Sequence, residues 1–357
     1  MHASSRKPYE GLHYGRFGTP TSFALEEAVC ALEGGYRSIS TASGLAAITG
    51  TLTALLGAGD HVLVSDSAYA PTRRFCDDQL ARYGVATTYY DPLIGAGIET
   101  LIRPETKVVV VESPGSLTFE VQDIPAIAAV AHRHDAIVVM DNTWATPLYF
   151  KAFEKGVDVS LQAATKFIVG HSDAMLGIIT TANEELWERI KTSIIRSGVC
   201  AGADEVYLGL RGLRTLSTRL RQHAESGLKL ASWLQGRPEV TRVLHPALPG
   251  DPGHALWKRD FLGCCGLFAF ELDASVTVQQ TDALIDGLEH FSIGYSWGGF
   301  ESLIIPTTGG IHRTAVPWTA KGPTLRIHTG LEDPDDLIAD LAAGLDRLRL
   351  NPQTAED

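Results

Sequence analysis

The stretch VDVSLQAATKFIVGHSD, residues 157–173, is the most informative part of this sequence. It opens with a mostly apolar run, 157–163, and then reaches Thr165 and Lys166. A short apolar run that ends in polar residues is typical of a buried parallel strand in an α/β domain. Because ligands of open α/β sheets lie outside the carboxyl ends of the strands, Lys166 is predicted to face a ligand.

The same pattern recurs before and after this stretch. The predicted strands are His61–Ser65, Val85–Asp91, Val108–Ser113, Ala136–Asn142, Val157–Ala163 and Ala174–Thr180. Helical periodicity lies between them, over Ser43–Leu56, Pro71–Tyr83, Ile124–His134 and Pro147–Lys155. This alternation predicts an α/β domain with a mixed, mostly parallel sheet that is covered by helices on both faces.

The pattern changes in the last third of the chain. Asp204–Leu234 is predicted to form one long amphipathic helix, which ends near Gly236 and Pro238. Beyond it we predict a smaller α+β domain, with strands Val240–His245, Leu267–Asp273, Leu303–Pro306 and Thr324–Thr329 and helices Val276–Glu289 and Pro334–Leu348. The predicted division is a short N-terminal segment (1–23), a large domain (24–235) and a C-terminal domain (236–357).

Composition excludes several classes of protein. The 357 residues are 45% hydrophobic and carry a formal net charge of -12, which argues against nucleic-acid or anionic-membrane partners and favours a small-molecule ligand. The five cysteines form no CxxC pair, and the histidines show no metal-binding pattern. The polar start, Met1–Lys7, and the absence of about 18 consecutive apolar residues predict a cytoplasmic protein.

Five features together predict the chemistry. Lys166 and Asp141 each end a predicted strand, and Ser43-Gly44-Leu45 opens a helix whose N–H groups could bind a phosphate. Alone, each feature has an ordinary explanation as a helix cap, an ion pair or a solvated side chain. Pyridoxal phosphate needs them together: a lysine for the imine, a carboxylate for the ring nitrogen and a phosphate site. Tyr69 could stack on the ring, and Arg326 could bind a substrate carboxylate.

Three segments carry a close resemblance to a known family. Residues 160–173 (SLQAATKFIVGHSD), 139–147 (VMDNTWATP) and 112–116 (ESPGS) resemble the signatures of the Cys/Met-metabolism family of pyridoxal-phosphate enzymes. The resemblance extends from about residue 14 to the last predicted helix. It implies the fold type I architecture: a large cofactor domain with a mostly parallel seven-stranded sheet, and a smaller C-terminal α+β domain.

The resemblance also implies roles for matching residues. Lys166 would hold the cofactor covalently and act in catalysis with Tyr69, which would stack on the ring, and Asp141 would pair with the pyridine nitrogen. The remaining roles are phosphate binding by Gly44, Leu45 and Thr165, phosphate binding across a subunit interface by Tyr14 and Arg16, and substrate binding by Arg326, Ser296, Trp297 and Tyr295. Shared sites of this kind imply at least a homodimer, and the family is usually tetrameric. Relatives usually carry several tens of residues before the Tyr-x-Arg element, so the sequence leaves the tetramer open.

One segment bears on the reaction. Residues 294–303, GYSWGGFESL, resemble the β-lyases of the family. Members that act at Cγ commonly have Glu at the position that matches Tyr295 and Leu at the position that matches Trp297. This implies β-elimination from cystathionine, which yields homocysteine, pyruvate and ammonia. Another cysteine S-conjugate lyase or a cysteine desulfhydrase stays open, as do a γ-lyase or γ-synthase and a non-catalytic protein of the same fold.

Overall fold

A computed structural model describes residues 12–348, and its larger sheet contains seven strands in the order β1-β7-β6-β5-β4-β2-β3. This confirms the predicted α/β class and strand number. The strands are β1 (Arg37–Thr41), β2 (His61–Ser65), β3 (Ala86–Tyr90), β4 (Thr106–Glu112), β5 (Ile137–Asp141), β6 (Val159–Gln162) and β7 (Gly177–Thr181).

The direction of the strands determines where polar residues gather. Strands β2 to β6 pair in parallel, and only β7 runs antiparallel to its neighbours, β1 and β6. The carboxyl ends of β4, β5 and β6 therefore lie at one edge of the sheet. Glu112 and Asp141, the last residues of β4 and β5, are direct neighbours in the register.

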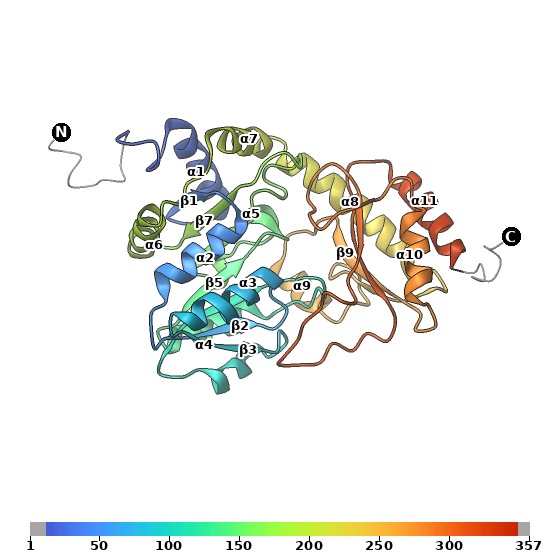
Figure 1. Cartoon of the computed structure of the whole chain (residues 1–357), viewed down its shortest axis with the longest axis horizontal. Helices are drawn as coiled ribbons and strands as arrows, with labels where there is room; N and C mark the ends of the chain where they lie inside the picture. The colour runs from blue at the N-terminus through green and yellow to red at the C-terminus, as the bar shows by residue number, and fades with distance from the viewer. Residues whose placement is uncertain (1–11, 349–357) are drawn as a thin grey trace.

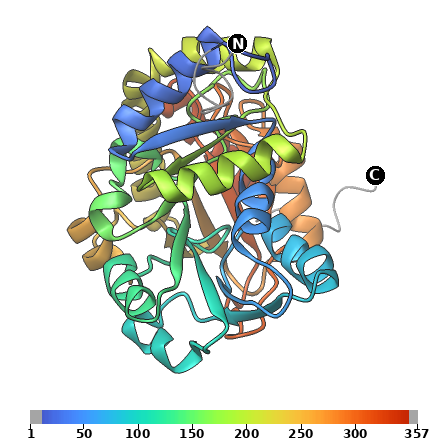
Figure 2. The same cartoon turned by 90° about the vertical axis from the view of Figure 1, so that its left-hand side faces the viewer.

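Helices cover both faces of this sheet, as predicted. One face packs against α2 (Gly44–Leu55), α3 (Ala70–Arg74), the π-helical turn Phe75–Leu80 and α6 (Glu184–Arg196). The other packs against α1 (Pro20–Glu33), α4 (Ile124–Arg133), α5 (Thr146–Tyr149) and α7 (Ala203–Leu213). Figure 2 shows α6 lying across the sheet near β1. Val108 and Val110 enter the first core and Val109 and Val111 the second, because successive side chains of a strand face opposite ways.

The prediction of one continuous helix over Asp204–Leu234 was wrong. The segment forms α7 and a second helix, α8 (Leu216–Gln235), with a break at Arg214 and Thr215. At the break Arg219 donates to the carbonyl of Gly212 at 2.8 Å, and also to that of Phe167 at 2.6 Å. A side chain on Gly212 would collide with the backbone of residues 168–169. The bend therefore lets α8 hold the segment that contains Lys166.

Three further differences concern other helices, turns and one strand. Strand β1 and helices α1 and α6 were not predicted, although each packs on the larger sheet. The predicted helix Pro147–Lys155 is only the short α5, followed by a 3-10 turn over Phe153–Lys155. A second 3-10 turn, Gly95–Leu101, precedes β4, and a short helix, α9 (His254–Asp260), lies between Leu244 and Leu267.

The second sheet has five strands in the order β10-β11-β12-β9-β8. These are β8 (Val240–Leu244), β9 (Leu267–Leu272), β10 (Ser292–Ile293), β11 (Leu303–Pro306) and β12 (Thr324–His328), with helices α10 (Val278–Asp286) and α11 (Pro334–Arg347). Figure 1 shows α8 running from the end of α7 into the C-terminal part of the chain, alongside β9 and toward α11. Leu216 and Leu220 at its start join the core of the large sheet, and Leu230 and Leu234 join the C-terminal core. Within residues 12–348, no helix is long and apolar enough to cross a membrane.

Candidate active site

Lys166 lies four residues beyond the end of β6 and points at the C-terminal part of the chain. Its Nζ donates to Oγ of Ser296 at 2.6 Å and lies 5.2 Å from the centre of the Trp297 ring. Burial, together with the positive charge of Arg326, lowers the pKa of Lys166 to about 8, although the carboxylate of Asp141 opposes the shift. Lys166 is therefore an amine with an appreciable neutral fraction near neutral pH.

Asp141 is held at the end of β5 by a single neighbour. Its Oδ1 accepts from the N–H of Thr143 at 3.0 Å and from the Thr143 hydroxyl at 2.5 Å, and that hydroxyl accepts from the N–H of Ala163 at 2.8 Å. Burial raises the pKa of Asp141, and the bonds from Thr143 and the charge of Lys166 lower it. A carboxylate in this position is stabilised by a cation brought to its other oxygen.

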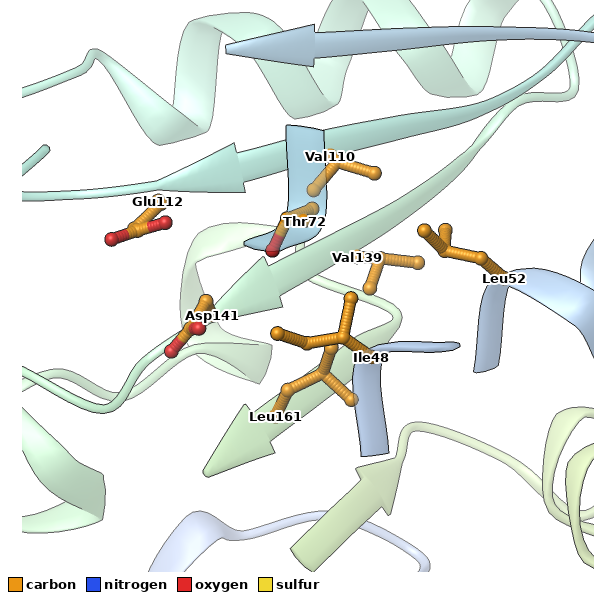
Figure 3. Close-up of a pocket in the computed structure, with 8 residues that line it drawn as sticks. All are labelled: Ile48, Leu52, Thr72, Val110, Glu112, Val139, Asp141 and Leu161. Atoms are coloured by element: carbon orange, nitrogen blue, oxygen red, sulfur yellow. The ribbon is translucent and has the colours of Figure 1, made fainter. Parts of the chain in front are cut away.

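Glu112 is a second acid at this edge, and the sequence analysis assigned it no role. Figure 3 shows it beside Asp141, with Ile48, Val139 and Leu161 lining the small cavity next to the two carboxyl groups. Burial, and then the negative charge of Asp141, raises the pKa of Glu112 well above its usual value. Burial therefore disfavours the charged form of Glu112. Its position at a strand end, one strand from Asp141, is the signal that could have found it.

Tyr69 begins helix α3 and keeps 44% of its surface exposed. Its backbone N–H donates to Oε2 of Glu112 at 2.7 Å. Burial raises the pKa of its hydroxyl, and the charges of Asp141 and Glu112 raise it further. The ring is thus placed near Asp141, remains neutral and has a free face on which a planar group could stack.

The N-terminus of α2 fits the predicted phosphate site. The first N–H groups of a helix have no partner within it. The side chain of Ser43 accepts from Ala46, so the N–H groups of Gly44 and Leu45 remain to bind an anion. A Cβ on Gly44 would lie 2.5 Å from that of Ala163, so glycine brings this helix end close to the segment before Lys166.

Thr165 differs from the expectation for a phosphate ligand. Its hydroxyl accepts from the N–H of Leu176 at 2.8 Å and donates to the carbonyl of the same residue at 3.2 Å. It lies beside Lys166, but these two bonds occupy its hydroxyl. In the described structure its contacts fasten the lysine segment to the residues before β7.

Arg326 lies on β12 and is only 6% exposed. Its Nη2 donates to the carbonyls of Gly294, Tyr295 and Ser296 at 3.0, 3.1 and 3.1 Å. Its Nε–H is buried and has no partner among the described residues, and burial lowers the pKa of the guanidinium to about 10. Arg326 therefore fixes the 294–296 loop and still has a donor for an anion. Tyr295 is 86% exposed, at the outside of the same loop.

Tyr14 and Arg16 are not brought to this site within one chain. Tyr14 is 61% exposed and packs edge-on against Phe17, and Arg16 donates to the carbonyl of Ile195 at the end of α6. None of their described contacts reaches Lys166, Asp141 or the start of α2. Their predicted role in the phosphate site of a neighbouring subunit stays a prediction.

Comparisons with known proteins agree on the family. A family model described as Cys/Met metabolism PLP-dependent enzyme matches residues 1–346. The chain is 48% identical to a cystathionine beta-lyase of Salmonella typhimurium and 47% identical to one of Escherichia coli, in each case over 352 residues that cover 97% of this chain and 89% of the relative.

A solved structure extends the comparison to the fold. The cystathionine gamma-lyase from Lactobacillus plantarum, complexed with L-serine, superimposes with a TM-score of 0.89 at 31% identity. The match covers 96% of this chain and 90% of that one. Because a γ-lyase shares the architecture so closely, the fold alone does not distinguish β from γ chemistry.

Proposed function

The chain belongs to the family of Cys/Met metabolism PLP-dependent enzymes, and we propose that it is a carbon–sulfur β-lyase that converts cystathionine and water to homocysteine, pyruvate and ammonia. The observation that carries this proposal is the identity of 47–48%, over nearly the whole chain, to relatives named cystathionine beta-lyase. Trp297, whose ring centre lies 5.2 Å from the Nζ of Lys166, and Tyr295 support β rather than γ chemistry through their resemblance to that subgroup.

The residues of the site fit pyridoxal phosphate. Lys166 offers an amine of lowered pKa, and Asp141 offers a partly buried carboxylate suited to a cationic ring nitrogen. The start of α2 offers N–H groups for a phosphate. Tyr69 offers a ring face between them. When bound, pyridoxal phosphate supplies an electron-withdrawing ring that stabilises negative charge at the Cα of an amino acid.

The protein's own groups divide the remaining work. Arg326 is positioned to bind the substrate α-carboxylate through its unpartnered Nε–H, with the adjacent Ser296 hydroxyl as a second donor. Because its pKa is lowered, a fraction of Lys166 is neutral, and the neutral Nζ takes the proton from Cα. The sulfur then leaves with the electron pair of the Cβ–S bond, and water hydrolyses the remaining three-carbon fragment to pyruvate and ammonia.

The assembly belongs to the same proposal. Tyr14 and Arg16 make no described contact with the site of their own chain, which agrees with a role in the phosphate site of a neighbouring subunit. A homodimer is then the smallest active unit, and a tetramer is the form proposed for the protein. We place its activity in the cytoplasm.

Product analysis tests the reaction directly. The purified protein with pyridoxal phosphate is given L-cystathionine, and pyruvate, 2-oxobutyrate and the two thiols are measured together. The proposal predicts pyruvate and homocysteine in equal amounts. Cysteine and 2-oxobutyrate would assign γ-elimination instead, and a protein that binds the cofactor without releasing either keto acid would be a non-catalytic member of the fold.

A further inference from the structure

Two buried histidines lie directly behind the lysine segment and have no part in the proposed reaction. His223 on α8 and His328 on β12 are both 0% exposed, and their ring centres are 5.1 Å apart. Phe167, the residue after Lys166, packs against both rings, at 5.4 and 6.0 Å. The pair thus joins the C-terminal sheet, helix α8 and the segment that contains Lys166.

His328 is bonded to the 298–299 turn through one ring nitrogen. Its Nε2 lies 3.1 Å from the N–H of Gly298 and 3.1 Å from the carbonyl of Gly299, and one nitrogen can serve only one of them. Acceptance from Gly298 requires the proton on Nδ1, and this tautomer is favoured because the neighbouring His223 ring has an unpartnered acceptor that complements an Nδ1–H donor. Burial lowers the pKa of His328 well below its usual value, which agrees with a neutral ring.

His223 has the complementary arrangement. Its Nδ1 lies 2.8 Å from the carbonyl of Thr329, so this nitrogen carries the proton and donates, and Nε2 is a bare acceptor. Burial lowers the pKa of His223 to about 4, so it too is neutral at physiological pH. The atoms left without a partner in the described structure are Nε2 of His223 and Nδ1 of His328. Neighbouring rings thus present one acceptor and one donor, which match each other chemically.

The turn that His328 holds lies against Lys166. Gly298 has a φ of 84°, and a Cβ built on it would lie 2.9 Å from the carbonyl carbon of Lys166, so the turn's backbone packs on that residue. Ser296 and Trp297, which contact the Nζ of Lys166, immediately precede this glycine. Strand β12 therefore fixes the segment at two points, through Arg326 at residues 294–296 and through His328 at Gly298.

We propose that His328, supported by His223, is a positioning residue that holds the 296–299 turn against Lys166. It acts through Ser296 and Trp297 and binds neither substrate nor cofactor. Removing the acceptor would release the turn, and the Ser296 hydroxyl would lose its fixed place beside the lysine amine. The inference rests on the proposed role of Lys166 as the reacting amine.

Nitrogen NMR of the protein labelled with ¹⁵N-histidine tests the tautomers without any measurement of activity. His223→Gln and His328→Gln variants assign the two sets of signals by their disappearance. The proposal predicts that both rings are neutral at pH 7 and carry their proton on Nδ1. A proton on Nε2 of His328, donated to Gly299, or a charged ring would overturn it, whether or not the protein proves to be a lyase.

Kinetics of matched variants test the consequence. His328→Leu removes the acceptor, and we expect kcat for cystathionine to fall about 10- to 100-fold while KM changes less, because Arg326 is untouched. His328→Gln offers an amide oxygen to Gly298 and should recover most of the rate. The control is His245→Leu, which replaces a histidine that is also 0% exposed but lies at the end of β8, and should leave kcat unchanged.

These variants separate the possible failures. A folded His328→Leu enzyme with wild-type kcat, or a His328→Gln enzyme no better than His328→Leu, would contradict the positioning role. A wild-type protein that releases no keto acid would contradict the proposed function instead, and the NMR result would then decide the hydrogen-bond assignment alone. If His328→Leu does not fold, the wild-type tautomers and the His328→Gln rate still decide the inference.

Discussion

The two sides of the site contain ionisable groups of opposite kind, acids on one side and basic groups on the other. The edge of the large sheet contributes Asp141 and Glu112, whose pKa values are raised by burial. The C-terminal sheet contributes Arg326 and His328, whose pKa values are lowered by burial. On each side, burial works against the charged form. Each side is therefore stabilised by a ligand that supplies the missing charge: a cation next to Asp141 and an anion next to Arg326.

The pKa of Lys166 depends on charges from both sides of the site. The guanidinium of Arg326 lowers its pKa, and the carboxylate of Asp141 raises it, with burial as the largest influence. A zwitterionic amino acid bound through its carboxylate would neutralise Arg326, and a cationic ring nitrogen would neutralise Asp141. The contrast shows that the charge of the site is completed by its ligands rather than by the protein.

The largest effect is expected where the two sides meet. Lys166→Ala removes the only amine that the described structure places against Ser296, so turnover of cystathionine should fall below detection. Lys107→Ala, on the exposed part of β4, is the control and should keep wild-type activity. Steady-state assays of pyruvate release measure both. Substantial activity in Lys166→Ala would refute its assigned role.

The next largest effect is a difference in kcat between variants of the two acids, Asp141 and Glu112. Asp141→Asn removes the negative charge proposed to face the ring nitrogen, and kcat should fall on the order of 1000-fold. Glu112→Gln replaces a carboxyl whose charged form is disfavoured by burial with an amide that can still accept the N–H of Tyr69, so kcat should stay within about threefold of wild type. Equal losses in the two variants would show that Glu112 is charged and that the comparison is wrong.

A smaller effect concerns the junction between the two sheets. Asp66, which follows β2, accepts from the N–H groups of Thr314, Ala315 and Val316 at 3.0, 2.8 and 3.2 Å and pairs with Arg73. Because the Asp66 side chain is fully buried, Asp66→Asn should lower the free energy of unfolding by about 3 kcal/mol.

Urea unfolding provides the measurement for Asp66. The control is Asp91→Asn, which alters a single exposed bond to the N–H of Leu93, and its expected loss is below about 1 kcal/mol. An Asp66 variant as stable as the Asp91 variant would mean that the C-terminal segment 314–316 is held by other contacts.

The last effect, which is absent at pH 7 and grows only in acid, is a pH dependence of stability next to the C-terminal sheet. Burial lowers the pKa of His245 to about 4, so this ring stays neutral in the folded protein while the unfolded chain takes up a proton below its usual pKa of about 6.5. Stability is therefore lost as the pH falls from about 6.5 to 4, by up to about 3 kcal/mol.

His245→Leu should remove this contribution. The difference in unfolding free energy between wild type and variant, measured in urea at pH 7 and at pH 4.5, should shift in favour of the variant at the lower pH. A difference that does not change with pH would mean that His245 is not buried as a neutral ring.

The sequence predicted the parts of the fold with strong patterns. Strand β2 was predicted to the residue, and β4, β5 and β6 within two or three, because their apolar runs end at clear polar residues. Strand β1 has the sequence RSIST and lacks such a run, so only its pairing with β7 defines it. The break before α8 depends on Arg219 reaching across to Phe167, a long-range contact that helical periodicity cannot show.

Prediction of the site was likewise limited to residues that do not depend on long-range contacts. Lys166, Asp141, Tyr69 and Arg326 could be selected because strand ends and family motifs mark them. Glu112 also ends a strand and could have been selected, although only the register shows that it lies beside Asp141. His328 could not be selected, since its importance depends on the neighbour that helix α8 brings to it. The roles of Tyr14 and Arg16, and the domain boundary at residue 236, stay predictions.

The most direct test of the account is to find which lysine holds the cofactor. The protein loaded with pyridoxal phosphate is reduced with borohydride, digested and analysed by mass spectrometry. The account predicts a pyridoxyl group on the peptide that contains Lys166 and on no other lysine. A group on a different lysine, or none at all, would contradict the claim that the two charged sides of this site meet at Lys166.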